Sequence, residues 1–163
     1  MGHGTDHRYQ RRFDHHLTKG SGMRAILGQY CINVTDLERS VAFWEGVLGI
    51  PVRSRTEIPG VLEAVLQAEE GGSRLQLAQH LDHEGPIDMG SAMWKIYVNT
   101  DDCQGLYEKA MAAGCESVTE PARLDRWPVT MAYVKDLDGY LLELIQYHEG
   151  TPPGVPDPST PRD

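Results

Sequence analysis

The sequence predicts an α+β fold made of two βαβββ modules whose curved mixed sheets together form a cup. The first observation is a repeat: a strand-like segment runs into a helix that ends at glycine, once from Gln29–Val34 and once from Met93–Val98. The second observation is that short strand-like segments separated by glycine-rich turns follow each helix. Such a module cannot bury its own sheet face, so two modules must pair and leave a groove between them. We place the domain at residues 23–148, with module one at 24–79 and module two at 93–147.

The first helix is expected after Thr35-Asp36-Leu37-Glu38, which fits a capping box with Thr35 as the cap. Apolar residues then recur on one helical face, and Gly49 follows where a left-handed residue ends a helix. Strands are expected at Pro51–Glu57, Val61–Ala68 and Arg74–Gln79.

The second helix repeats this scheme, with Thr100 or Asn99 as the expected cap and Gly114 as the stop. The strands expected after it are Ser117–Glu120, Val129–Lys135 and Tyr140–Tyr147. Asp136-Leu137-Asp138-Gly139 joins the last two strands as a tight hairpin turn.

Composition excludes several classes of function. The net charge of −9 disfavours nucleic acid and anionic membranes as partners, because both need a basic face. No apolar stretch is long enough to span a membrane. Three cysteines without close pairing predict reduced thiols and a cytoplasmic protein.

The two ends are not expected to belong to the fold. Residues 1–22 are polar and rich in histidine, as in a disordered tail, a cloning remnant or a region before a mis-assigned start codon. Residues 149–163 are rich in proline and are expected to be disordered.

Two motifs resemble the vicinal oxygen chelate superfamily of glyoxalases, bleomycin-resistance proteins and dioxygenases. They are Val34-Thr-Asp-Leu-Glu-Arg-Ser-Val-Ala-Phe-Trp44 and Val134-Lys-Asp-Leu-Asp-Gly-Tyr-Leu-Leu-Glu-Leu-Ile145. The resemblance covers roughly Met23–Tyr147. It implies four cup-facing positions that hold a divalent metal in the metal-dependent members, where the metal polarises substrate oxygens.

Carried over to this chain, those four positions are Gln29, Gln76, Met93 and Glu143. Gln29 is counted back from Asp36 and Met93 from Val98, Gln76 lies on the last strand of module one, and the hairpin turn fixes Glu143. One carboxylate, two amides and a thioether are poor ligands for Zn²⁺, Ni²⁺ or Mg²⁺. No metal or other cofactor is therefore expected, although a divalent metal stays possible. A shift of two residues would replace Met93 by Lys95.

Strand alternation sends further side chains into the cup. Lys95, Tyr97, Asn33 and Arg74 are expected there, while Trp94, Ile96 and Val98 should pack against the helix. Lys95 should neighbour Glu143 and supply the charge that a buried carboxylate needs. A structural ion pair, a catalytic pair with Glu143 as base, and ligand anchoring all stay open.

Arg126 and Trp127 precede a strand at the mouth of module two. They are expected either to clamp a carboxylate or planar ligand, or to be an ordinary loop pair.

The first functional hypothesis is a metal-independent binder of a small organic molecule, similar to bleomycin-resistance proteins. The alternative is a glyoxalase-like lyase or isomerase that uses Glu143 and a divalent metal. The resemblance also implies a homodimer.

Overall fold

The computed structural model describes residues 27–150 and contains two βαβββ modules, so the predicted fold class is confirmed. The first module consists of β1 (Gln29–Asn33), α2 (Leu37–Val41), η1 (Ala42–Val47), β2 (Val52–Ile58), β3 (Val61–Leu66) and β4 (Arg74–His80). The second consists of β5 (Ile96–Asn99), α3 (Cys103–Ala112), β6 (Glu116–Arg123), β7 (Val129–Lys135) and β8 (Leu141–Tyr147). The expectations for residues 1–22, and for all of the C-terminal segment beyond Gly150, lie outside the described residues.

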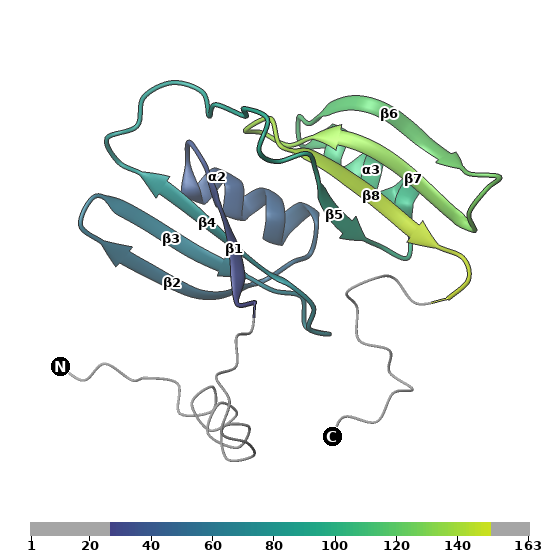
Figure 1. The fold of residues 1–163 in the computed structure, drawn as a ribbon, viewed down its shortest axis with the longest axis horizontal. Coiled ribbons are helices and arrows are strands. Elements are labelled where there is room, and N and C mark those ends of the chain that lie inside the picture. Colours follow the sequence, from purple (N-terminus) through teal and green to yellow (C-terminus); the bar gives the residue numbers. More distant parts are fainter. Residues whose placement is uncertain (1–26, 151–163) are drawn as a thin grey trace, which may run out of the picture.

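Each module forms its own four-stranded sheet, in the order β1-β4-β3-β2 and β5-β8-β7-β6. In both sheets the first strand pairs in parallel with the last one, and the remaining pairs are antiparallel. The modules lie side by side (Figure 1). The β7–β8 turn connects them: the Tyr140 hydroxyl donates to the Asn33 carbonyl at 2.8 Å, and the Asp138 carboxylate accepts from the Thr35 amide at 3.1 Å.

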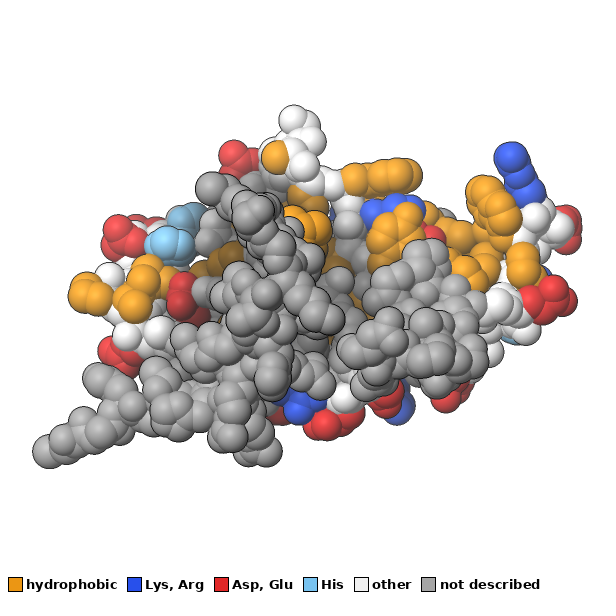
Figure 2. Space-filling view, turned by 60° about the horizontal axis from the view of Figure 1, so that its bottom comes forward, with side chains coloured by type: hydrophobic (Ala, Val, Ile, Leu, Met, Phe, Trp, Pro, Cys, Tyr) orange, Lys and Arg blue, Asp and Glu red, His pale blue; other side chains and the backbone are white. Residues whose placement is uncertain are grey.

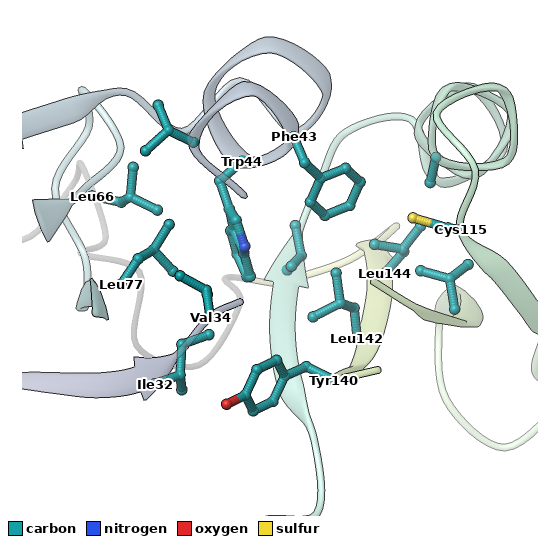
Figure 3. Close-up of a cluster of buried hydrophobic side chains, with 14 of the residues drawn as sticks. Ile32, Val34, Phe43, Trp44, Leu66, Leu77, Cys115, Tyr140, Leu142 and Leu144 are labelled. Atoms are coloured by element: carbon teal, nitrogen blue, oxygen red, sulfur yellow. The ribbon is translucent and has the colours of Figure 1, made fainter. Parts of the chain in front are cut away.

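One hydrophobic core joins the helices of both modules to their sheets. Trp44 and Phe43 on η1 point into it, opposite Leu142 and Leu144 of β8 (Figure 3). The predicted helical face is confirmed, because Leu37, like Trp44, is buried. The sequence did not indicate that this helix widens into a π-helix over residues 42–47. The core fixes one face of each sheet against the helices, so the other face is available for a site.

The expected helix caps are wrong in both modules. Asp36 caps the first helix by accepting from the Arg39 amide at 2.9 Å, and Asp102 caps the second by accepting from the Gly105 amide at 2.9 Å. The Thr35 hydroxyl is bound to the Asp138 carboxylate instead. In the second module the Thr100 hydroxyl accepts from the Asp102 amide at 3.1 Å, so Thr100 lies two residues before the cap.

The expected capping box is absent from the first helix for a second reason. Glu38, which should reach back to the cap, instead forms an ion pair with Arg55 on β2. The helix stops were predicted correctly: Gly49 and Gly114 have φ values of 73° and 95°, which glycine adopts without strain.

A glutamine holds the start of each helix in the same way. The Leu37 amide donates to the Gln79 side chain at 2.8 Å, and the Cys103 amide donates to the Gln146 side chain at 3.1 Å. Both contacts satisfy an amide that has no partner inside the helix. They also make Leu37 and Cys103 equivalent, which fixes the alignment of one module on the other.

The first strand of module two is shorter than predicted. It begins at Ile96, and residues 81–95 form the connection between the modules. Trp94 therefore does not pack against the helix as expected; it is 76% exposed, while Val98 is buried as predicted. The indole of Trp94 instead lies over the Lys95 ammonium group, 4.1 Å from the ring centroid.

Candidate functional site

The strand register identifies the equivalent cup-facing positions of the two modules. Cys31 on β1 pairs with Gln76 on β4, and Tyr97 on β5 pairs with Glu143 on β8. Lys95 precedes Cys103 by the same interval at which Gln29 precedes Leu37. Gln29 is therefore matched by Lys95, and Gln76 by Glu143.

The assignment of Met93 to this set is corrected to Lys95. The position was counted back from Val98 to a strand expected to start at Met93, whereas the strand begins at Ile96. This error displaced the position by two residues. The four positions that the family resemblance implies are thus Gln29, Gln76, Lys95 and Glu143.

Lys95 and Glu143 form a buried ion pair. The Lys95 Nζ contacts the Glu143 Oε2, and the two side chains are only 8% and 5% exposed. β8 places Glu143 in the centre of its sheet, between Tyr97 of β5 and Tyr133 of β7. The expected proximity of the two charges is confirmed. Because the charges of Lys95 and Glu143 compensate each other, neither residue needs a further counter-ion here.

Tyr133 connects the two members of the ion pair. Its hydroxyl accepts a hydrogen bond from the Lys95 Nζ at 3.0 Å and donates one to the Glu143 Oε2 at 3.1 Å. Aromatic rings also surround the ammonium group: its nitrogen lies 4.7 Å from the centroid of Tyr97 and 5.3 Å from that of Tyr133. Together with the indole of Trp94, these rings form an aromatic cage that favours a cation.

The environment keeps Lys95 protonated. Burial, the largest single cause, lowers the pKa of the lysine, but the hydrogen-bonding side chains around it, Glu143 first, and the charge of Glu143 together raise it by more, so the net pKa lies above the ordinary value. The Lys95 ammonium is paired with the Glu143 carboxylate and donates to the Tyr133 hydroxyl. Lys95 is therefore a resident cation held by partners inside the protein.

The matching pair of module one carries no charge. The Gln29 side-chain amide donates to the Gln76 side-chain carbonyl. Within residues 27–150, no hydrogen bond or ion pair joins this glutamine pair to the Lys95–Glu143 pair. The structure thus brings the four positions together as two separate pairs.

Asn33 and Arg74 lie away from the ion pair. Asn33 borders a cavity of about 450 Å³ that is also lined by His80, His83 and Asp88. The Arg74 Nε donates to the Gln67 side chain at 3.1 Å.

Arg126 and Trp127 contact each other in the loop between β6 and β7. The guanidinium carbon of Arg126 lies 5.1 Å from the centroid of the Trp127 ring, and the ring is 56% exposed. Met93 lines a cavity of about 70 Å³ together with Met89 and Trp94, next to Lys95.

Tyr133 was missed by the sequence reasoning, although a signal for it existed. The Asp136–Gly139 turn fixes the hairpin register, and that register puts Tyr133 directly opposite Glu143. The position of Trp94 over Lys95 had no comparable signal, because the segment before β5 has no regular structure.

The donor set does not fit a divalent metal. A protonated lysine is no metal ligand, and its charge repels a cation placed beside Glu143. The remaining amides of Gln29 and Gln76 are weak ligands that bind each other. Among residues 27–150, no three His, Cys, Asp or Glu side chains gather as a possible metal-binding group.

No helix in the described part of the chain is long and apolar enough to cross a membrane.

Comparison with known sequences finds relatives of this chain. A lactoylglutathione lyase of Neisseria meningitidis is 32% identical over 123 residues, which cover 73% of this chain and 88% of the relative. A probable lactoylglutathione lyase of Synechocystis is 27% identical over 118 residues, covering 71% of this chain and 90% of the relative.

Solved structures show the same fold at lower sequence identity. Glyoxalase I from Zea mays superposes with a TM-score of 0.66 at 22% identity; the match covers 75% of this chain and 45% of the maize chain, so it spans about half of that enzyme. A glyoxalase family protein from Bacillus cereus superposes with a TM-score of 0.67 at 17% identity, covering 79% of this chain and 98% of the other. A sequence model of the same family matches residues 26–144. The chain belongs to the Glyoxalase/Bleomycin resistance protein/Dioxygenase superfamily.

Proposed function

We propose that this protein binds a small organic molecule in its cup and does so without a divalent metal. The observation that carries the proposal is the Lys95–Glu143 ion pair at two of the four positions implied for the metal. Because the Lys95 ammonium is paired with Glu143 and donates to Tyr133, it supplies a positive charge of the protein's own at this position. The site then resembles the metal-independent binders of the superfamily.

The relatives favour a second candidate, a glyoxalase-like lyase or isomerase. Two of the matched relatives are named lactoylglutathione lyase or probable lactoylglutathione lyase, which supports an enzyme more than a bleomycin-resistance-type binder. In this candidate Glu143 would act as the base that moves a proton within the substrate, and the Lys95 ammonium would stabilise the developing oxyanion. Against it stands the geometry: the Lys95 ammonium is paired with Glu143 and donates to the Tyr133 hydroxyl, so these contacts compete with a substrate oxygen.

One experiment separates the two candidates. The protein is purified without chelator, the histidine-rich residues 1–22 are removed, and the metal content is measured. Breakdown and formation of lactoylglutathione are then assayed with and without added Ni²⁺ or Zn²⁺. The Neisseria meningitidis relative serves as the positive control. We expect well under one equivalent of metal and no lyase activity. Stoichiometric metal together with metal-stimulated turnover would overturn the proposal and establish the lyase.

We also propose that the protein acts as a homodimer. Within residues 27–150, no hydrogen bond or ion pair joins the glutamine pair to the ion pair, and this supports a cup completed by a module of a second copy. Light scattering on the eluting protein is expected to give twice the chain mass; a single-chain mass at micromolar concentration would contradict this.

A further inference from the structure

The open face of the second sheet, opposite α3, is lined by aromatic rings. Alternation along β8 directs Leu142 and Leu144 into the core and Glu143 to the other face. Because directly paired residues share a face, Tyr97 and Tyr133 flank Glu143 there. Tyr147, two residues further along the same face than Ile145, is close enough for Glu143 and Tyr97 to contribute to its raised pKa, after burial as the larger cause.

One of these rings is exposed, and the other two, Tyr133 and Tyr147, are half-buried. Tyr97 is 57% exposed on β5, the edge strand beside Glu143. Figure 2 shows hydrophobic side chains gathered at the surface over the second module, with charged side chains between them. Large exposed aromatic rings on one face are typical of a binding surface.

The charges beneath the rings cancel. Lys95 and Glu143 carry opposite charges in direct contact, and the equivalent residues of module one are two uncharged amides. A charged ligand would lose hydration at this face and find no unpaired counter-charge in return. A neutral ring loses little hydration and gains stacking contacts with tyrosine.

The open face of the first sheet is polar by comparison. Its register places Gln76 beside Cys31 and Val65, and Glu63 beside Ala78 and Thr56. The proximity of Cys31 and Glu63 is independently evident, since burial first and the Glu63 charge second raise the pKa of the Cys31 thiol. The chain thus offers one aromatic wall and one wall of hydrogen-bonding groups.

We infer that the ligand is an uncharged planar aromatic compound with a hydrogen-bonding substituent, whose ring lies on Tyr97, Tyr133 and Tyr147 of the second sheet. The inference rests on the proposed metal-independent binding and names its ligand class. A site built around a metal cation would instead select a ligand with anionic oxygens.

The test uses three probes of one shape and different charge: 1-naphthol, 1-naphthoate and 1-naphthylmethylammonium. Dissociation constants at neutral pH are measured by isothermal titration calorimetry on the full chain. We expect 1-naphthol to bind at least about tenfold more tightly than either ion. Equal or tighter binding of an ion, or no binding of 1-naphthol, would overturn the inference.

Variants locate the binding face. Tyr97→Ala should weaken 1-naphthol binding by at least about fivefold, because a stacking partner is lost. Tyr97→Phe should retain binding, since the ring remains. Tyr30→Ala is the matched control, because Tyr30 is also 57% exposed but alternates to the opposite face of the first sheet. An equal effect of both alanine variants would show that the naphthol binds elsewhere.

The two proposals fail in different ways. Stoichiometric metal in protein without residues 1–22 would overturn the proposed function, whatever the naphthol series shows. Metal-free protein that prefers an ionic probe would overturn only the ligand class.

Discussion

Glu143 and Lys95 neutralise each other in a position that is nearly closed to solvent. Glu143 lies on β8 and Lys95 directly precedes β5, the parallel neighbour of β8, and Tyr133 bonds to both. Removal of one member of such a pair leaves the other as a buried uncompensated charge, which costs far more than a surface ion pair contributes. The charge balance of the cup therefore depends on both Lys95 and Glu143.

Lys95→Met is expected to lower the free energy of unfolding by about 3–5 kcal/mol, because it leaves the Glu143 carboxylate buried without a cation. Chemical denaturation measures the change. Lys135→Met is the matched control: the Lys135–Glu116 pair is largely exposed, so its loss should cost about 1 kcal/mol or less. The double variant Lys95→Met with Glu143→Leu should recover most of the stability. Equal costs for Lys95→Met and Lys135→Met would show that the first pair is solvated.

Glu143→Gln is expected to change which probe binds. The amide leaves the Lys95 ammonium as an unpaired positive charge under the aromatic wall, so the ratio of 1-naphthoate to 1-naphthol affinity should rise by at least about tenfold. Glu116→Gln, at an exposed pair, should leave that ratio unchanged. If Glu143→Gln destabilises the protein and the ratio stays constant, Glu143 has only a structural role.

The helices and most strands could be predicted because their signals are local. The spacing of Leu37, Val41 and Trp44 identifies a buried helical face, and the β7 strand, Val129–Lys135, was predicted with its observed bounds. The proximity of Lys95 and Glu143 followed from strand order alone. These features depend on neighbours along the chain or on one strand pairing.

What could not be predicted depends on competition between partners. Thr100 and Asp102 are both good capping residues, and only the structure shows that the threonine bonds to the Asp102 amide while the aspartate caps the helix. The site position moved from Met93 to Lys95 for another reason, because β5 begins at Ile96 rather than at Met93. The exposure of Trp94 and the separation of the two pairs depend on how the modules pack, which no local pattern encodes.

Asp136 is expected to make stability fall as pH rises through the mildly acidic range. Burial raises its pKa from 3.8 to about 6, although backbone amides of Tyr140 and Asp138 donate to it and lower the pKa in part. With the folded pKa above the unfolded value, the folded protein binds the proton more tightly, so stability is greatest below pH 4 for this group and decreases until about pH 6.

Asp136→Asn tests this linkage. The amide oxygen can still accept from both backbone amides, but it carries no charge. At neutral pH the variant should be more stable than the wild type by up to about 3 kcal/mol, and the difference should shrink as pH is lowered to about 4. Thermal or chemical denaturation across this range measures it, with the exposed Asp101→Asn as control. A difference that does not vary with pH would show that Asp136 titrates normally.

Zn²⁺ and Ni²⁺ are expected to stabilise the wild-type protein very little, because Lys95 repels a cation from the one carboxylate of the set and stabilisation requires occupancy of a native site. Melting temperatures are compared with and without metal after removal of the histidine-rich residues 1–22. The variant Gln29→His, Gln76→Glu, Lys95→His supplies imidazole and carboxylate ligands at the equivalent positions and should gain several degrees on metal addition, about 3 kcal/mol at a hundredfold excess over the dissociation constant. Lys109→His, on the exposed surface of α3, is the control for a histidine added outside the set. If the wild-type protein held one equivalent of metal through Glu143 and Gln29, the Lys95–Glu143 ion pair would not be the resting state of the site. The glyoxalase-like lyase would then be the favoured function.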